Sequence, residues 1–133
     1  MTSNVFANCE LSEELFTKDS IIYQEGEELS FIRFIVKGEV IVLKAKKQVW
    51  RGYKNEFLGL TSFFNKNTTY CNSALTASET SIIKIKKVDF ENALSQSKKL
   101  NNAIIRILLE RIKHTSDYSK DAEHLIKKRI LSL

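Results

Sequence analysis

The sequence predicts an α+β fold that is mainly β: a sandwich or barrel of short strands followed by a long C-terminal helix. Between Leu15 and Lys86, short apolar runs alternate with turn residues. This spacing is typical of antiparallel sandwiches and barrels rather than of strands that alternate with helices. From Ala103 to Leu133 the chain contains neither Gly nor Pro, so one helix can run there, unbroken or broken once. The 133 residues suffice for one domain with one core.

The first part of the strand region holds three apolar runs with glycine turns between them. We expect strands over Ser20–Gln24, Ser30–Lys37 and Glu39–Ala45. Gly26 and Gly38 separate these runs, where tight turns need a positive φ or strands pass closely. Alternation in the second run places three apolar residues on one face and Arg33 on the other; the three are Ile32, Phe34 and Val36.

The second part of the strand region begins at a charged hairpin tip. We expect this tip at residues 46–47, followed by a strand over Val49–Tyr53. A last pair of strands is expected over Thr69–Ala77 and Thr80–Lys86. In the final strand, the two side chains expected to point inward are Ile83 and Ile85.

After Lys86 the apolar period changes from two residues to the helical spacing. Val88, Phe90 and Leu94 suit one short helix, with Asp89 near its start. A second helix follows, and Asn101 or the next residue, also Asn, can cap it. The apolar side chains of its first half point nearly all the way round, so the helix must be buried on more than one side.

A second copy of the chain is the simplest partner for the remaining apolar side of this helix. The apolar and small residues follow steps of four and three, which is the pattern of a dimer seam of about three heptads. The seam contains two polar members, and such positions set register or contact a ligand. The predicted seam residues are Ile104, Leu108, Arg111, Thr115, Tyr118, Ala122 and Leu125.

Composition places the chain among globular proteins, with 43% hydrophobic residues, 28% charged residues and a net charge of +5. No apolar run approaches the length of a membrane span, so we expect no membrane partner. Met1–Leu11 has neither the basic region nor the apolar stretch of a secretory signal, so we expect a cytoplasmic protein. Basic residues outnumber acidic ones from Lys99 onward; they form either a solvated helix face or a surface near nucleic acid.

The residues that carry enzyme or metal chemistry are few and widely spaced. Cys9 and Cys71 form no CxxC pair and are too few for an iron–sulfur cluster. His114 and His124 both fall in the C-terminal helix, away from the strands that would hold a cupin metal. No nucleophile–base arrangement and no phosphate-binding glycine loop is present. We therefore expect a chain that is not an enzyme and that holds no metal.

Five segments in this order resemble the cyclic nucleotide-binding-like domain of CRP/FNR-type transcription regulators. The resemblance covers about residues 14–120 and implies a double-stranded β-helix, a jelly-roll-like β-roll, with a long C-terminal dimerisation helix. It also implies that Asn55, where the family has Gly, takes a left-handed backbone. The matching segments are Phe16–Gly26, Phe34–Val40, Asn55–Leu60, Ala77–Ile85 and Glu110–Ser116.

The resemblance further implies a division of the chain and a function. Residues 1–98 would form the β-roll with its short helix, and residues 99–133 the dimerisation helix and the start of a hinge. The function implied is that of the effector-sensing and dimerisation part of a regulator, acting as a homodimer. In the family a helix-turn-helix domain begins near Lys127–Leu133, so we expect DNA binding only through a C-terminal domain absent from this chain. The alternative is a free-standing β-roll module that dimerises or docks without an effector.

The resemblance places an effector pocket after Gly59, the glycine of the Asn55–Leu60 segment. In the family a Glu there binds the ribose, and an Arg about a dozen residues later binds the cyclic phosphate. This chain has Leu60 at the Glu position and Cys71 or Tyr70 at the Arg position. We therefore expect a small-molecule effector of unknown identity, and doubt cyclic AMP. The candidate pocket residues are Gly59, Leu60, Thr61, Tyr70, Cys71, Asn72, Thr115 and Ser116.

Overall fold

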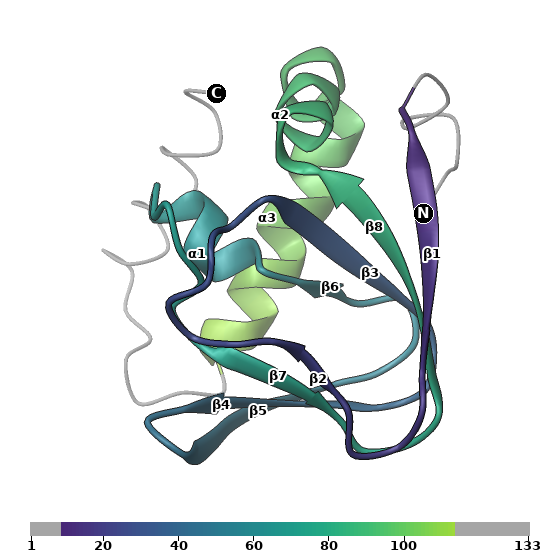
Figure 1. Cartoon of the computed structure of the whole chain (residues 1–133). Coiled ribbons are helices and arrows are strands. Elements are labelled where there is room, and N and C mark those ends of the chain that lie inside the picture. The colour runs from purple at the N-terminus through teal and green to yellow at the C-terminus, as the bar shows by residue number, and fades with distance from the viewer. Residues whose placement is uncertain (1–8, 114–133) are drawn as a thin grey trace. The chain divides into compact units, whose positions relative to one another are not determined.

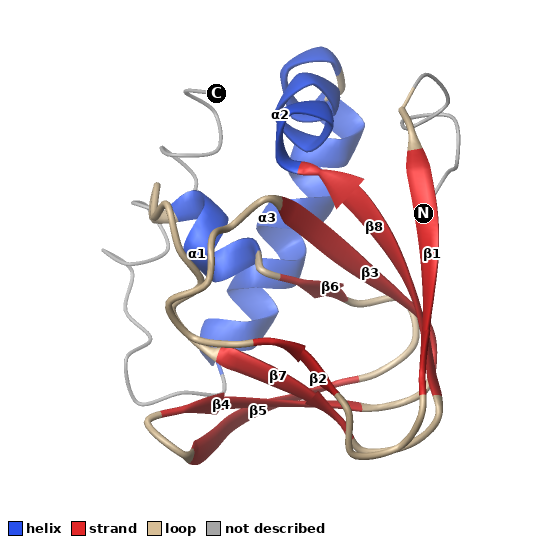
Figure 2. Cartoon of the chain, viewed as in Figure 1, coloured by secondary structure: helices blue, strands red, loops and turns tan. Residues whose placement is uncertain are grey.

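The computed structural model describes residues 9–113, with side chains to residue 109 (Figure 1). These residues divide into two compact units, residues 9–89 and 90–113, and each is described by itself below. The first unit consists of short strands with one short helix, and the second is helical (Figure 2). None of the helices in this range is long and apolar enough to cross a membrane.

Eight strands form two antiparallel four-stranded sheets, which confirms the mainly β fold. One sheet has the order β1-β8-β3-β6 and the other β2-β7-β4-β5, so strands distant in sequence lie side by side (Figure 1). This crossed order is that of a jelly-roll-like β-roll. The strands are β1 (Leu11–Phe16), β2 (Ile21–Tyr23), β3 (Phe31–Lys37), β4 (Val40–Lys44), β5 (Lys47–Gly52), β6 (Phe57–Leu58), β7 (Ser73–Thr76) and β8 (Thr80–Lys86).

The strand faces differ in part from the predicted alternation. In β3, Ile32 is fully buried as expected, whereas Val36 is 36% exposed. The reason is a register shift between Ile35 and Lys37 against β8, since a one-residue shift moves the following side chains to the other face. In β8, Ile85 is buried as predicted, whereas Ile83 is only partly buried.

The β4–β5 hairpin turns through Ala45 and Lys46, one residue before the predicted tip. Both have positive φ, 50° and 67°, which is the geometry of a two-residue type I′ turn. Strand β5 consequently begins two residues earlier than expected. The register shifts between Val42 and Leu43, which leaves Val49 as the extra residue of a bulge, 55% exposed. A bulge on the edge strand protects it from pairing with other chains.

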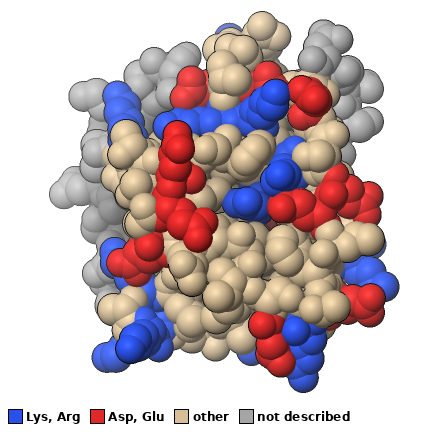
Figure 3. Space-filling model, viewed as in Figure 1, with Lys and Arg blue, Asp and Glu red and all other residues tan. Residues whose placement is uncertain are grey.

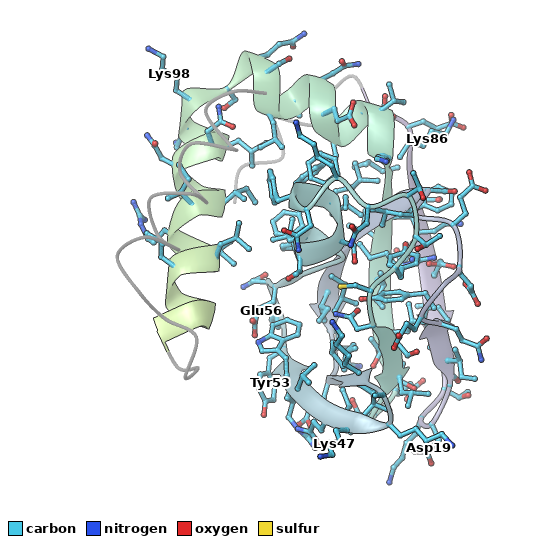
Figure 4. All side chains as sticks on the ribbon, turned by 90° about the vertical axis from the view of Figure 1, so that its left-hand side faces the viewer. Asp19, Lys47, Tyr53, Glu56, Lys86 and Lys98 are labelled. Carbon is cyan, nitrogen blue, oxygen red and sulfur yellow. The ribbon has the colours of Figure 1, made fainter. Side chains whose placement is uncertain are left out.

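Left-handed backbone occurs where the glycines and Asn55 predict it. Gly26 has φ 92°, Gly38 has φ 105° and Asn55 has φ 70°. At Asn55 the turn is closed by the backbone N–H of Tyr53, which donates to the Glu56 carboxylate at 3.0 Å. Figure 4 shows these two side chains on the same side of the β-roll. The turn leads the chain into β6 and thus positions the segment that follows.

The helices α2 (Lys87–Gln96) and α3 (Lys98–Lys113) occur where the helical period predicts them. The start of α3 is different from the prediction, because Ser97 caps it: its hydroxyl accepts a hydrogen bond from the Leu100 N–H at 3.1 Å. Asn101 is inside the helix, and its side-chain amide donates to the Leu94 carbonyl at 2.9 Å. This bond braces the junction between the two helices. In α2, Val88 is 58% exposed and does not belong to a buried face.

Candidate effector site

The predicted pocket segment begins at a sharp turn into the short helix α1 (Leu60–Phe64). Gly59 precedes the helix with φ 94°, a conformation that favours glycine. A side chain here would lie 3.5 Å from both Ile32 Cδ1 and Tyr70 Cε1, so backbone angle rather than space requires the glycine. Leu60, at the family's Glu position, is fully buried. The position therefore contributes to the core and offers no acceptor for a ribose hydroxyl.

The loop after α1 returns along residues 25–29 and pairs with them through the backbone. The Gly26 N–H donates to the Tyr70 carbonyl, and the Tyr70 N–H donates to the Glu27 carbonyl, both at 2.9 Å. A third bond of 2.9 Å joins the Leu29 N–H to the Thr68 carbonyl. The backbone N–H and C=O of Tyr70 are therefore both hydrogen-bonded, which fixes the position of its Cα.

The Tyr70 side chain is buried and held at both its ring and its hydroxyl. The ring stacks on Tyr23, with centroids 3.8 Å apart and planes 14° from parallel. The hydroxyl donates to the Phe31 carbonyl at 2.9 Å and accepts a hydrogen bond of 2.7 Å from Arg33 Nη1. Burial raises the pKa of Tyr70 above its ordinary value, although the neighbouring Arg33 charge opposes this shift. The hydroxyl therefore stays protonated as a donor.

Arg33 of β3 brings a positive charge to this segment from outside it. Only 10% of its side chain is exposed, and its Nε donates to the Glu14 carboxylate at 3.2 Å. Lys84 lies 3.8 Å from the other oxygen of Glu14, and its ammonium is 4.4 Å from the centre of the Phe31 ring. The result is a cluster of two cations and one carboxylate beside aromatic rings. Figure 3 shows that basic and acidic side chains lie next to each other at several places on the face it displays.

Cys71 follows Tyr70 and is tied to α1. Its backbone N–H donates to the Ser62 hydroxyl at 2.9 Å, and that hydroxyl lies 3.1 Å from the thiol sulfur. Ser62 is 1% exposed, so this polar pair is held inside the protein. Asn72 comes next, and its side-chain oxygen accepts a long hydrogen bond of 3.4 Å from the Tyr23 hydroxyl. Both positions that the resemblance proposed for the arginine thus carry uncharged, engaged side chains.

The structure brings most of the predicted pocket residues into one region, with one exception among those described. Gly59, Tyr70, Cys71 and Asn72 lie around the start of α1 and the returning loop, whereas Thr61 points to solvent. Leu60 is buried in the core, and the last two predicted residues, Thr115 and Ser116, lie outside the described residues.

Sequence reasoning missed Arg33 as a member of the site. The signal was present, because Arg33 interrupts the apolar run of its strand. Tyr23 and Glu14 carried no comparable signal. Their role depends on contacts between strands far apart in the chain, which periodicity does not encode.

Only two of the seven predicted seam residues have side chains that the structure describes. Ile104 is fully buried and Leu108 is 7% exposed. Ile105, Ile107 and Leu109 of α3 are partly exposed. The remaining five seam residues lie outside the side chains that the structure describes; they are Arg111, Thr115, Tyr118, Ala122 and Leu125. The seam stays a prediction.

A separate hollow of about 160 Å³ lies at the other end of β3, where Lys37 meets Phe16 and Thr80. It contains neither pocket-segment residues nor the Arg33 cluster. Within residues 9–113, no three His, Cys, Asp or Glu side chains gather as metal ligands would. This hollow is therefore distinct from the predicted effector site.

Comparison with known proteins identifies the type of domain. The family model described as the cyclic nucleotide-binding domain matches residues 13–97. Comparison with curated proteins finds no match. Among solved structures, the sensor domain of the transcriptional regulator DNR from Pseudomonas aeruginosa is similar, with a TM-score of 0.73 and 11% identity. The match covers 90% of this chain and 89% of that one.

Two further solved structures share the fold. The catabolite activator protein of Thermus thermophilus has a TM-score of 0.67 and 12% identity, over 82% of this chain and 58% of that one. The regulatory subunit of a cAMP-independent protein kinase A from Trypanosoma cruzi, bound to guanosine, has a TM-score of 0.59 and 24% identity. That match covers 64% of this chain and 31% of the other. At these identities the likeness shows a shared fold.

Proposed function

This chain belongs to the cyclic nucleotide-binding domain family, and we propose that it is the effector-sensing and dimerisation domain of a CRP/FNR-type transcription regulator. In this proposal the chain does not hold cyclic AMP in the usual way of the family, catalyses no reaction and does not bind DNA by itself. The observation that carries the proposal is that the two candidate arginine positions hold Tyr70 and Cys71, whose side chains are uncharged and already in contact with other groups.

Neither position offers a cation to a cyclic phosphate. Tyr70 is stacked on Tyr23, and its hydroxyl is already hydrogen-bonded to Arg33 and to a backbone carbonyl. The Cys71 thiol lies against the Ser62 hydroxyl. A charge-assisted hydrogen bond contributes about 1.5–3 kcal/mol to binding. Its loss weakens the affinity for cyclic AMP by about tenfold to more than a hundredfold.

The Leu60 side chain, at the position where the family has a ribose-binding Glu, has a separate effect on nucleotide binding. Leu60 fills the core at this position, so a ribose hydroxyl finds no carboxylate there. A polar group that leaves water without a new partner costs about 1–3 kcal/mol. The two substitutions together argue for an effector other than cyclic AMP. The Trypanosoma cruzi neighbour, which is bound to guanosine, suggests a nucleoside without phosphate as one compound to test.

The dimerisation part of the proposal rests on α3. Its mostly apolar first half includes the partly exposed Ile105, Ile107 and Leu109. Partly exposed aliphatic side chains in adjacent turns of a helix are a surface that a second helix can cover. Analytical ultracentrifugation of the chain at tens of micromolar should show a dimer. A monomer at that concentration contradicts this part of the proposal.

The experiment that tests the effector part is isothermal titration calorimetry of the chain with cyclic AMP and, in parallel, guanosine. We expect cyclic AMP to give no saturable heat at concentrations where family members with the arginine saturate. Tight binding of cyclic AMP overturns the proposal. If neither these compounds nor a broader effector screen gives binding, the free-standing interaction module becomes the better description. A gel-shift assay with palindromic duplexes at physiological salt tests the DNA part, and a tight complex contradicts it.

A further inference from the structure

We propose that Arg33, a residue of β3, binds the oxyanion group of this domain's effector, a carboxylate or a phosphate. The inference deepens the proposed function and rests on it: the domain senses a small anion, and the cation comes from the sheet instead of the pocket segment. Three observations support this role for Arg33, namely its position, its free hydrogen-bond donors and the net charge around it.

The position of Arg33 places it at the pocket segment. Its Nη1 lies 2.7 Å from the Tyr70 hydroxyl, and Tyr70 borders Gly59 at the start of α1. The only cation inside residues 61–72 is Lys66, which is exposed. Arg33 is therefore the buried cation that the described part of the site provides.

The guanidinium of Arg33 retains free donors. Nε is used by Glu14 and Nη1 by Tyr70, whereas Nη2 pairs with no described residue. The exposed tenth of the side chain lies with the partly exposed Lys84 and Glu14, whose side chains are 24% and 27% exposed. Nη2 is not a buried atom without a partner, so it keeps contact with solvent and an anion can reach it.

The charges around Arg33 leave a positive excess. Arg33 and Lys84 share one carboxylate, that of Glu14, so these three groups carry a net charge of about +1 at neutral pH, while the Glu27 carboxylate acts on the Tyr70 hydroxyl from outside the group. The Tyr23, Phe31 and Tyr70 rings lie within 6 Å of the guanidinium and displace water from it. An ion pair next to low-dielectric groups is stronger than the same pair in water. The cluster therefore favours an anion over a neutral ligand.

The Tyr70 hydroxyl and the Glu14 carboxylate compete with a bound anion for Arg33. Removal of the hydroxyl in Tyr70→Phe frees Nη1 and keeps an aromatic ring to stack on Tyr23. Removal of the charge in Glu14→Gln leaves both cations without their carboxylate. Each substitution should tighten anion binding, by about threefold to tenfold.

Nuclear magnetic resonance of the Arg33 Nε–H during titration of the full chain tests the inference. Inorganic phosphate and succinate are the two probes, because they separate a phosphate source from a carboxylate source. We expect a saturable shift with at least one of them. The affinities of the variants are measured by isothermal titration calorimetry with the same two anions, because Arg33→Met has no Nε–H to observe. Arg33→Met should weaken the affinity by about tenfold or more. Lys66→Met, the matched control, should leave it unchanged.

Three results overturn the inference. The first is the absence of a saturable shift with either anion. The second is binding that survives Arg33→Met and is lost in Lys66→Met. The third, which remains informative even if Arg33→Met fails to fold, is an unchanged affinity in Tyr70→Phe. None of these results alters the cyclic AMP titration, so a failure here is distinguishable from a failure of the proposed function.

Discussion

The hydroxyl of Tyr70 lies 2.7 Å from Nη1 of Arg33, which joins the pocket segment to the strand β3. Because the same hydroxyl donates to the Phe31 carbonyl, one oxygen bridges the backbone and the side chain of β3. The ring below it is stacked on Tyr23. This arrangement keeps Tyr70, one of the two candidate arginine positions, packed inside the protein.

The first prediction concerns the stability provided by this bridge. Tyr70→Phe should lower the free energy of unfolding by about 1–2 kcal/mol, since it leaves a buried carbonyl and one guanidinium nitrogen without their partner. Urea unfolding measures the difference. Tyr53→Phe is the control, because Tyr53 is 47% exposed, and it should change stability by less than about 0.5 kcal/mol. Equal effects of the two substitutions contradict the structural role of the Tyr70 hydroxyl.

The second prediction concerns pH. Burial raises the pKa of Tyr70 in the folded protein above the ordinary value of 10.0, so the folded state favours the neutral hydroxyl. Its contribution to stability is fully present below that ordinary value and is lost as the pH rises through the folded-state pKa. Denaturation midpoints should fall in this alkaline range, and the tyrosinate absorbance should show late ionisation of Tyr70. In Tyr70→Phe the late ionisation should be missing and the fall should be smaller.

The third prediction compares two glycines with positive φ. A side chain at Gly38 would lie 2.6 Å from the Glu79 carbonyl oxygen and 2.8 Å from Thr80 Cα, both backbone atoms that cannot swing away. At Gly26 nothing lies within 4 Å of a side chain. Gly38→Ala should therefore cost about 2–4 kcal/mol, from strain plus overlap. Gly26→Ala should cost only the strain, about 1–2 kcal/mol. Thermal unfolding of both variants gives the comparison, and an equal cost rules out the overlap at Gly38.

The fourth prediction concerns the β4–β5 turn. Ala45 and Lys46 both adopt positive φ, where Asn and Gly are the favoured residues of a type I′ turn. The double change Ala45→Asn with Lys46→Gly should raise the free energy of unfolding by about 1–2 kcal/mol. Lys47→Gly, within the neighbouring strand, should lower it by about 0.5–1 kcal/mol. A destabilised double variant shows that the turn has a different geometry.

Six of the eight strands in the described residues were predictable from sequence, because each overlaps a short apolar run bounded by turn residues. Strands β1 and β6 were not expected, since β1 is mostly exposed and polar and β6 has two residues. Gly26, Gly38 and Asn55 mark turns by their chemistry, and all three have the expected positive φ. The position of Val36 was not predictable, because it depends on a register shift in strand pairing. Such shifts arise from contacts between distant strands, which a pattern within one strand does not contain.

The site was predictable only in its chain segment. The sequence shows directly that Leu60 follows Gly59 where the family has a Glu. It also shows that no arginine lies near Cys71. Arg33 was assigned to the face opposite Ile32, yet both side chains are buried, at 8% and 0% exposure. Strand β3 is thus covered on both faces, and alternation cannot distinguish a buried charged residue from a solvated one in such a strand. The partners of Arg33 come from β1 and the pocket segment, far away in sequence.

The central claim is that the pocket segment lacks the cation that holds a cyclic phosphate. Calorimetric titration of cyclic AMP into the unaltered chain and into Cys71→Arg, side by side, tests it most directly. We expect no saturable heat for the unaltered chain. We expect Cys71→Arg to bind cyclic AMP measurably, with an affinity about tenfold or more above that of the unaltered chain. Binding of cyclic AMP by the unaltered chain that is as tight as, or tighter than, that of Cys71→Arg would contradict it.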